Sequence, residues 1–217
     1  MKRKTRKFFY IAIFFLIAFI LWTIAVKFVD TSPIGPDASM VGFATINSFF
    51  HNLTGVHMSL YTITDWLSLV PICFVFAFGM SGFIQLIKRK KLLKVDYDIL
   101  ILGGFYIAVM AVYVLFEIIS INYRPILIEG EPEISYPSST TMLVMCIVPT
   151  VIMQLKTKIK NINLKRIVSF ALSLFTIFMV VCRLISGVHW LSDIIGGILL
   201  SAGLVMLYKT FISLKTE

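Results

Sequence analysis

Long apolar runs alternate with short polar or basic stretches along almost the whole chain of 217 residues. A helix that crosses the hydrocarbon core of a bilayer needs about 20 predominantly apolar residues. Six runs approach or reach that length, at residues 8–26, 67–87, 99–121, 141–155, 167–181 and 191–211. The pattern therefore predicts an all-α fold, a polytopic membrane helix bundle with about six transmembrane helices.

The first apolar run, within residues 1–30, follows a basic head that holds five Lys or Arg residues. A cleaved signal peptide has the same order of charge and apolarity, but its apolar region is shorter and ends at a small-residue cleavage site. Because we find no such site, we predict that this run is the N-terminal transmembrane helix.

One longer polar stretch, residues 30–65, separates the first two runs and contains His51 and His57. We expect a short amphipathic helix near residues 43–50 of this stretch and interpret both histidines as polar loop residues. No linker divides the chain, so we predict a single integral membrane domain over residues 1–217.

The composition excludes a water-soluble protein. Hydrophobic residues make up 59% of the chain and charged residues only 14%, and the mean hydropathy is +0.93. Soluble globular domains contain about 25% charged residues.

Cys73, Cys146 and Cys182 all lie in apolar runs. Their spacing indicates neither a zinc site nor a disulfide framework, and we interpret them as small buried hydrophobic residues.

The positive charge is distributed by membrane side. The formal net charge is +9, but 17 of the 20 Lys and Arg residues fall in the termini and loops that share one side of the membrane. The other side holds only Lys27, Arg124 and Arg183. Because Lys and Arg are enriched on the cytoplasmic side, we predict that both termini are cytoplasmic. The basic blocks then suit membrane lipids as partners, and not nucleic acid.

Two smaller patterns concern the placement of the helices. Trp22, Trp66 and Trp190 would all lie near the outer interface, as an aromatic belt predicts. Gly196 and Gly197 in the last run favour close packing of helices.

Candidate chemistry collects at the outward end of the fifth and sixth runs. A charged group at such a depth is costly unless it has a partner, so Arg183 is a functional candidate. His189 and Asp193 are four residues apart at the start of the last helix and share one helix face. An Asp that accepts a hydrogen bond from one ring nitrogen makes the other nitrogen a better nucleophile. Arg183 can supply a bidentate clamp for a phosphate group.

A second anion-binding pattern precedes the fourth helix. Pro137 is followed by Ser138 and Ser139, either of which can cap the helix, and the free N–H groups of its first turn would point at an anion. Arg124 begins the same outer loop and brings a second guanidinium group. The two patterns together predict a phosphate-binding site at the outer ends of the helices.

In order and spacing these motifs resemble the type 2 phosphatidic acid phosphatase family, which carries the signatures Lys-x6-Arg-Pro, Pro-Ser-Gly-His and Ser-Arg-x5-His-x3-Asp. This chain has Arg124-Pro125, then Pro-Ser-Ser-Thr over residues 137–140, then Cys-Arg-x5-His-x3-Asp over residues 182–193. The resemblance covers roughly residues 60–210. It implies a lipid phosphate or diphosphate phosphatase of the cell membrane, with its active site on the extracytoplasmic side.

The resemblance also implies roles for individual residues. His189 would attack phosphorus to form a phosphohistidine, oriented by Asp193, and the substrate-binding residues would be Arg124, Ser138, Ser139, Thr140 and Arg183. Water would then hydrolyse the intermediate. No metal and no cofactor is implied.

Two positions depart from the family pattern. Glu117 stands where the first signature has its lysine, and Thr140 where the second has the histidine that acts as general acid. General acid catalysis contributes about 10²- to 10⁴-fold, and it matters most for a basic leaving group. We therefore expect a polyprenyl diphosphate to suit this chain better than a phosphate monoester such as phosphatidic acid. Glu117, His51 or His57 could replace the missing acid, or Glu117 could neutralise an arginine.

The residues leave two further functions open. The phosphoryl group could pass from His189 to an alcohol, which would make the protein a lipid phosphotransferase. Alternatively, the substituted signatures could belong to a protein that binds or transports a lipid phosphate without cleaving it.

Overall fold

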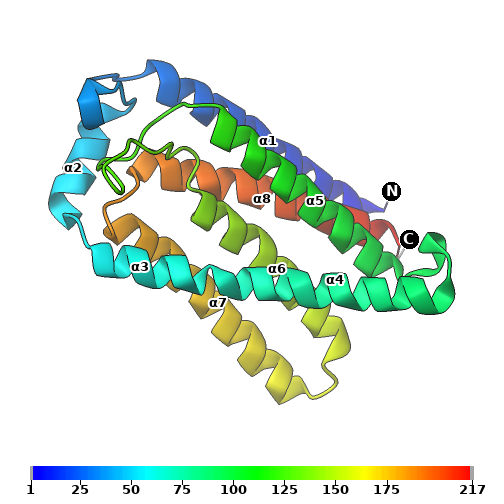
Figure 1. Ribbon diagram of the computed structural model, residues 1–217. Coiled ribbons are helices and arrows are strands. Elements are labelled where there is room, and N and C mark those ends of the chain that lie inside the picture. The colour runs from blue at the N-terminus through cyan, green and yellow to red at the C-terminus, as the bar shows by residue number, and fades with distance from the viewer. Residues whose placement is uncertain (1, 216–217) are drawn as a thin grey trace.

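The computed structural model describes residues 2–215, in which six helical segments are long and apolar enough to span a membrane (Figure 1). The spanning segments are α1 (Arg3–Phe28), α3 (Met58–Leu67) continued by α4 (Leu69–Arg89), α5 (Tyr97–Ile118), α6 (Ser139–Lys158), α7 (Ile162–Ile185) and α8 (Leu191–Leu214). A shorter helix, α2 (Ala44–Thr54), and two single 3-10 turns, η1 (Pro36–Ala38) and η2 (Leu92–Lys94), complete the helical elements. The all-α bundle with six spans is therefore confirmed.

The second span is longer than its apolar run indicates, because the helix begins at Met58 and not near residue 67. Threonines make the first turns polar, yet their hydroxyl groups bond within the helix. The Oγ1 of Thr62 donates to the Met58 carbonyl at 3.0 Å, and that of Thr64 to the Leu60 carbonyl at 2.8 Å. Such local bonds satisfy the hydroxyl groups inside the helix. A hydropathy pattern counts each threonine as polar whatever its partner, so it did not predict α3.

The remaining elements differ from expectation only at their ends. The amphipathic helix expected near residues 43–50 is present as α2. The fourth span runs as α6 from Ser139 to Lys158 and continues through Pro149, whereas the third span ends at Ile118 and not at residue 121.

Two helices form the interior of the bundle. In the apolar windows of α6 and α8, 56% of residues are buried, against 6–28% in the other spans. The predicted close packing at the glycines of α8 is confirmed. A Cβ added to Gly196 would lie 2.7 Å from the Tyr136 ring, and one added to Gly197 would lie 3.2 Å from the Ser138 carbonyl oxygen.

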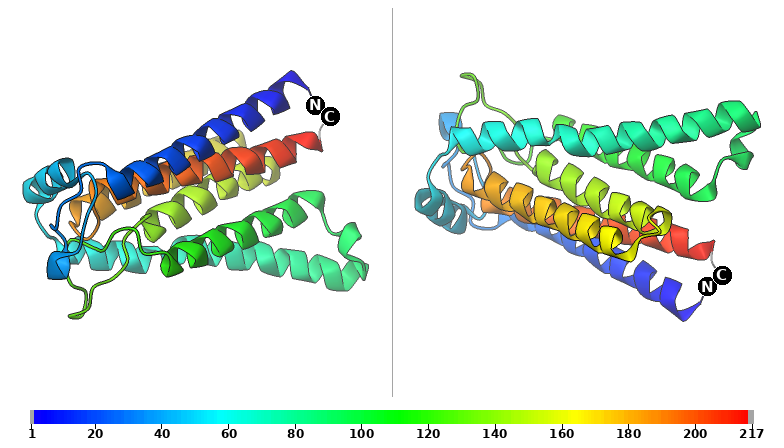
Figure 2. Two further views of the ribbon diagram at one scale, coloured as in Figure 1. Left: turned by 90° about the horizontal axis from the view of Figure 1, so that it is seen from above. Right: turned by 90° about the horizontal axis from the view of Figure 1, so that it is seen from below.

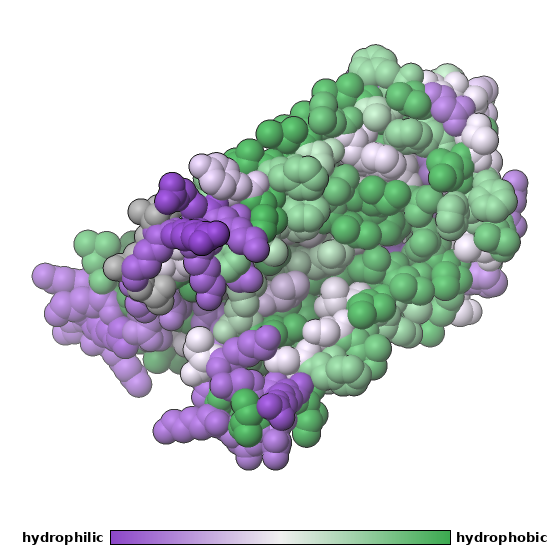
Figure 3. Space-filling view, turned by 180° about the vertical axis from the view of Figure 1, so that it is seen from behind, coloured by the Kyte–Doolittle hydropathy of each residue, from purple (hydrophilic) through white to green (hydrophobic). Residues whose placement is uncertain are grey.

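Both termini lie together at one end of the bundle, and α2 with the loops that precede α6 and α8 lies at the other end (Figures 1 and 2). Figure 3 shows hydrophilic side chains gathered at the end that carries the termini, next to a broad hydrophobic surface over the middle of the molecule. This distribution is the one that a multi-pass membrane protein requires.

Two sequence interpretations need correction. Cys73 is exposed on the surface of α4, so only Cys146 and Cys182 are buried. Trp190 is only 3% exposed, and its indole N–H donates to the Tyr123 carbonyl at 2.7 Å. It therefore packs inside the end of the bundle and cannot belong to a lipid-facing aromatic belt, although Trp66 is 70% exposed.

Candidate functional site

Three segments converge at the end of the bundle opposite the termini: the loop 119–138, the first turn of α6, and the turn 186–190 that leads into α8. An isolated antiparallel bridge between Tyr123 and Ile134 closes the loop on itself. Beside it the Arg124 backbone N–H donates to the Glu133 carbonyl at 2.9 Å. The loop therefore holds the Arg124 backbone next to this isolated bridge, at the end of the bundle opposite the termini.

The imidazole of His189 lies between a guanidinium group and a carboxylate. Its Nε2 is 3.3 Å from Nη1 of Arg124, and its Nδ1 is 3.8 Å from Oδ2 of Asp193. A guanidinium group can only donate, so Nε2 must accept and carry the lone pair. In the neutral ring the proton then stands on Nδ1, on the side of the carboxylate.

The surroundings of His189 favour this neutral ring. Burial, and then the positive charges of Arg124 and Arg183, lower the pKa of His189 well below its usual range. The side chain is only 3% exposed. A neutral imidazole that carries its lone pair on Nε2 is the form that can attack phosphorus.

Asp193 is held firmly in the first turn of α8. It is fully buried, and its Oδ2 accepts the Trp190 backbone N–H at 3.0 Å while its Oδ1 accepts the Asn122 amide N–H at 3.2 Å. The first of these bonds caps the helix in the manner of a capping box. The carboxylate therefore keeps a fixed place beside Nδ1 of His189, longer than a hydrogen bond but close enough for a direct charge interaction.

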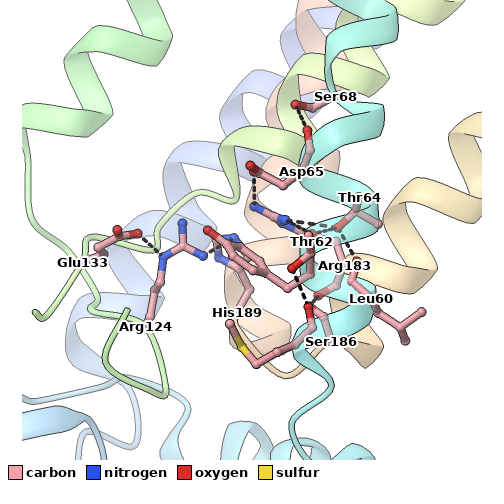
Figure 4. Close-up of polar contacts among 12 residues, drawn as sticks. Leu60, Thr62, Thr64, Asp65, Ser68, Arg124, Glu133, Arg183, Ser186 and His189 are labelled. Carbon is pink, nitrogen blue, oxygen red and sulfur yellow. Dashed lines mark hydrogen bonds and ion pairs between the residues drawn. The ribbon is translucent and has the colours of Figure 1, made fainter. Parts of the chain in front are cut away.

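Arg183, in the last turn of α7, points toward α3 (Figure 4). Its Nη1 donates to Oγ1 of Thr64 at 3.1 Å and to the carbonyl of Tyr61 at 3.4 Å, and its Nη2 lies 3.7 Å from the carboxylate of Asp65. The side chain is 2% exposed, and its Nε has no hydrogen-bond partner among the described residues. One edge of the guanidinium group is thus fixed by α3.

Arg124 is oriented from the other side (Figure 4). Its Nε lies 2.9 Å from Oε2 of Glu133, which is 44% exposed at the mouth of the site. The two arginines therefore pair with Glu133 and Asp65 in the described structure, and these ion pairs do not involve Glu117. Glu117 lies at the end of α5, where it lines a small cleft together with Ser139.

The first turn of α6 approaches Asp193 through its backbone. The Ser138 N–H donates to the Asp193 carbonyl at 3.1 Å, which draws the start of α6 onto the start of α8. Ser138 is the N-cap residue, but its side chain makes no capping bond, and its Oγ is buried without a hydrogen-bond partner in the described residues. Thr140 is also buried, whereas Ser139 is half-buried and faces the cleft beside Glu117.

The two histidines of the polar stretch occupy different places. His51, on α2, packs its ring 5.5 Å from the ring of Trp190, and burial lowers its pKa. His57 lies before α3, and its Nε2 is 2.8 Å from the Thr54 carbonyl. The His57 N–H donates to the Ser186 carbonyl at 3.0 Å, so both histidines lie near the turn that carries His189, and the described structure shows no hydrogen bond from either to the His189 ring.

Several residues at the site escaped the sequence analysis. They are Asn122, which bonds Asp193, Glu133, which pairs with Arg124, and the α3 residues Tyr61, Thr64 and Asp65. Asp65 did carry a signal, because it is an acidic side chain directly before an apolar run and needed a partner. In the part of the chain that the structure describes, no three His, Cys, Asp or Glu side chains come together as possible metal ligands.

Comparison with known proteins bears on the family and on the fold. Residues 119–217, somewhat less than half of the chain, match the family model of the PAP2 superfamily, which is the family that the motifs resemble. The chain is also similar in fold to the crystal structure of a transmembrane PAP2-type phosphatidylglycerolphosphate phosphatase from Bacillus subtilis, with a TM-score of 0.61 and 16% identity. That similarity covers 94% of this chain and 96% of the other chain. A comparison with curated protein sequences found no match.

Proposed function

We propose that this membrane protein is a lipid phosphate or diphosphate phosphatase that works through a phosphohistidine on His189. One observation carries the proposal: Nε2 of the buried His189 faces Nη1 of Arg124 at 3.3 Å, while Nδ1 faces Asp193 at 3.8 Å. The ring therefore has a nucleophilic lone pair directed toward a phosphate-binding group and a carboxylate that stabilises positive charge on the ring.

In the first step the Nε2 lone pair of His189 attacks the terminal phosphorus, and the bond from phosphorus to the leaving oxygen breaks. The leaving group takes the bonding electron pair, and the ring becomes an imidazolium that keeps its proton on Nδ1 beside Asp193. Arg124 and Arg183 bind the phosphoryl oxygens, together with the Ser138 hydroxyl, which has no other partner among the described residues.

In the second step water adds to phosphorus and the bond between phosphorus and Nε2 breaks. The electron pair returns to the ring of His189, which becomes neutral again, and the phosphate leaves with both protons of the water. This balance needs no additional base. A close variant replaces the water with an alcohol and gives a lipid phosphotransferase, so the acceptor is part of what the experiment must test.

The identity of the leaving group decides the substrate preference. A lipid phosphate that leaves from a diphosphate is a weak base and departs without a proton, whereas an alkoxide that leaves from a monoester needs one. Thr140, which stands where the family has its acid histidine, is buried and carries no titratable group. We therefore propose a polyprenyl diphosphate as the preferred substrate class. The phosphatidylglycerolphosphate phosphatase named above supports a lipid phosphate more generally.

The site is proposed to face the outside of the cell membrane. It lies at the end of the bundle opposite both termini, and the basic blocks of the sequence gather at the end that carries the termini (Figures 1 and 3). The enrichment of Lys and Arg on the cytoplasmic side supports this orientation. Labelling of a single introduced cysteine near residue 130 by a membrane-impermeant reagent in intact cells tests it.

Phosphate release by the purified protein in detergent is the decisive experiment. A polyprenyl diphosphate and phosphatidic acid are offered separately to wild-type protein and to the His189→Ala variant. We expect release from the diphosphate that the substitution reduces by at least about 10³-fold, and slower release from phosphatidic acid. Equal rates on both lipids would contradict the leaving-group argument.

The outcome also separates the alternatives. A folded protein that binds the lipid but yields no trapped phosphohistidine would be a binding or transport protein. Release that appears only when an alcohol acceptor is added would identify a phosphotransferase. Activity unchanged by His189→Ala would exclude the proposed nucleophile.

A further inference from the structure

One aromatic ring of α3 contacts both arginines of the site. The Cζ of Arg183 lies 4.6 Å from the centroid of the Tyr61 ring, and the Cζ of Arg124 lies 5.8 Å from the same centroid. Both distances fall within the range of about 6 Å over which a guanidinium group is attracted by an aromatic face. The two arginines are 59 positions apart in the sequence, and Tyr61 belongs to a third segment.

The backbone around Tyr61 reinforces the contact. The Tyr61 carbonyl accepts from Nη1 of Arg183 at 3.4 Å, and Oγ1 of Thr64, one turn further along α3, accepts from the same nitrogen at 3.1 Å. Arg183 is 2% exposed, so these contacts operate away from water, where cation–aromatic attraction is strongest. The same turn therefore supplies a ring and two acceptors to one guanidinium group.

The ring also has an electrostatic task. Arg124 and Arg183 both carry a positive charge, and both approach the same Tyr61 ring, so each repels the other. Two cations converging on one site must be held against that repulsion until an anion binds between them. The negative face of a shared ring can do this without occupying the N–H groups that a phosphate needs, unlike the carboxylates of Asp65 and Glu133.

From these contacts we propose that Tyr61 is a positioning residue that sets the spacing of the Arg124 and Arg183 guanidinium groups for a phosphoryl anion. The identity of the anion as a lipid phosphate rests on the proposed function. The binding experiment below does not depend on it. Tyr61 lies outside residues 119–217, the part that matches the family model, so the first helical turns of the second span complete the anion clamp.

Binding of orthovanadate, a small mimic of the phosphoryl group, tests the inference without requiring lipid turnover. Affinity is measured on full-length protein in detergent for wild type, Tyr61→Leu and Tyr61→Phe, with Trp66→Leu as the matched control. Trp66 is an aromatic residue of the same helix but is 70% exposed. We expect Tyr61→Leu to weaken vanadate binding about 10-fold, and Tyr61→Phe and Trp66→Leu to stay within about twofold of wild type.

Rescue by phenylalanine distinguishes the ring from its hydroxyl group. If Tyr61→Phe is as weak as Tyr61→Leu, the hydroxyl group and not the ring face is required, and the inference is wrong. It is equally wrong if Tyr61→Leu binds vanadate like wild type, or if wild type does not bind vanadate at all. Where Tyr61→Leu does not fold, Tyr61→Met replaces it as the variant without a ring.

Lipid turnover separates this inference from the proposed function. If wild type binds vanadate and the Tyr61 series behaves as expected, but no lipid is hydrolysed, the phosphatase proposal fails while the role of Tyr61 stands. If lipid is hydrolysed, we expect Tyr61→Leu to raise KM for the diphosphate more than it lowers kcat, because a displaced clamp loses binding before it loses the nucleophile.

Discussion

The two halves of this chain contribute differently to the site. Residues 119–217 supply the candidate nucleophile, its carboxylate and both arginines, and they contain α6 and α8, the two most buried spans. Residues 2–118 supply none of these groups, yet they provide several of the contacts that orient them. Tyr61 and Thr64 contact Arg183, and Asn47 and Trp22 bond to Ser192 at the start of α8.

Residues 119–217, which match the family model, therefore contain the candidate reacting groups, but the candidate site also includes residues of the first half. Asn47 is fully buried, donates to Oγ of Ser192 at 2.9 Å, and accepts the Ser192 N–H at 3.1 Å. The α2 helix thus fixes the first turn of α8 and, with it, Asp193. Substitutions in the first half should change binding and stability, whereas substitutions in the second half should change the chemical step.

The largest effect is expected from two carboxylates, one in each half. Asp193→Asn keeps the shape of the side chain but removes the charge that stabilises an imidazolium, so we expect kcat to fall about 10³-fold. Asp65→Asn removes a 3.7 Å ion pair whose carboxylate is 60% exposed, and we expect less than a tenfold change. Steady-state release of phosphate measures both, and similar losses would abolish the contrast between the halves.

Asn47 and Asn122 offer the next comparison. Asn47→Ala leaves the buried Ser192 N–H without a partner, and we expect unfolding to become easier by about 1–3 kcal/mol. Asn122→Ala removes only the 3.2 Å bond to Asp193, so activity should fall more than stability. Thermal unfolding in detergent, run beside the activity assay, measures both quantities. An Asn122→Ala variant that is the less stable of the two would argue against this division.

Two glycines compare the packing of a buried span with that of an exposed one. Gly196→Ala on α8 would place a methyl group 2.7 Å from the Tyr136 ring, and such overpacking costs about 1–3 kcal/mol. Gly103→Ala on α5 meets no atom within 4 Å, and the better helix propensity of Ala stabilises by up to about 1 kcal/mol. Midpoints of thermal unfolding should therefore move in opposite directions. A destabilised Gly103→Ala variant would mean that α5 packs against something at this face.

The smallest effect is expected from pH. Burial and then the two guanidinium groups lower the pKa of folded His189 well below the unfolded value of about 6.5. The unfolded chain therefore takes up the proton first as the pH falls below that value, and stability present at neutral pH is lost. We expect the unfolding temperature of wild type to fall between pH 7 and pH 5, and to fall less in His189→Asn.

His51, in the other half, is the matched control for pH. Burial alone lowers its pKa, and its ring is not fully enclosed. We expect His51→Asn to flatten the pH dependence less than His189→Asn does. A larger effect at His51 would show that the turn beside Trp190, and not the site itself, controls the acid sensitivity.

Much of this protein could be predicted from the sequence, because the responsible signals are local. Apolar runs of spanning length indicated six helices, and the spacing from Arg183 to His189 and Asp193 indicated one end of the bundle and the resemblance to the PAP2 superfamily. Gly196 and Gly197 indicated the close contact of α8 with its neighbours. A bilayer allows few alternatives to a helix for an apolar run, so hydropathy alone determined most of the architecture.

Only the tertiary structure decided how the arginines are held. Arg183 contacts α3 across about 120 positions of sequence, and neither Tyr61 nor Thr64 belongs to a motif or to an apolar period. The polar character of α3 even concealed it as a helix, since its threonine hydroxyl groups bond to its own backbone. A pattern along the chain reports the environment of each segment, whereas the partner of a buried charge depends on which helix packs beside it.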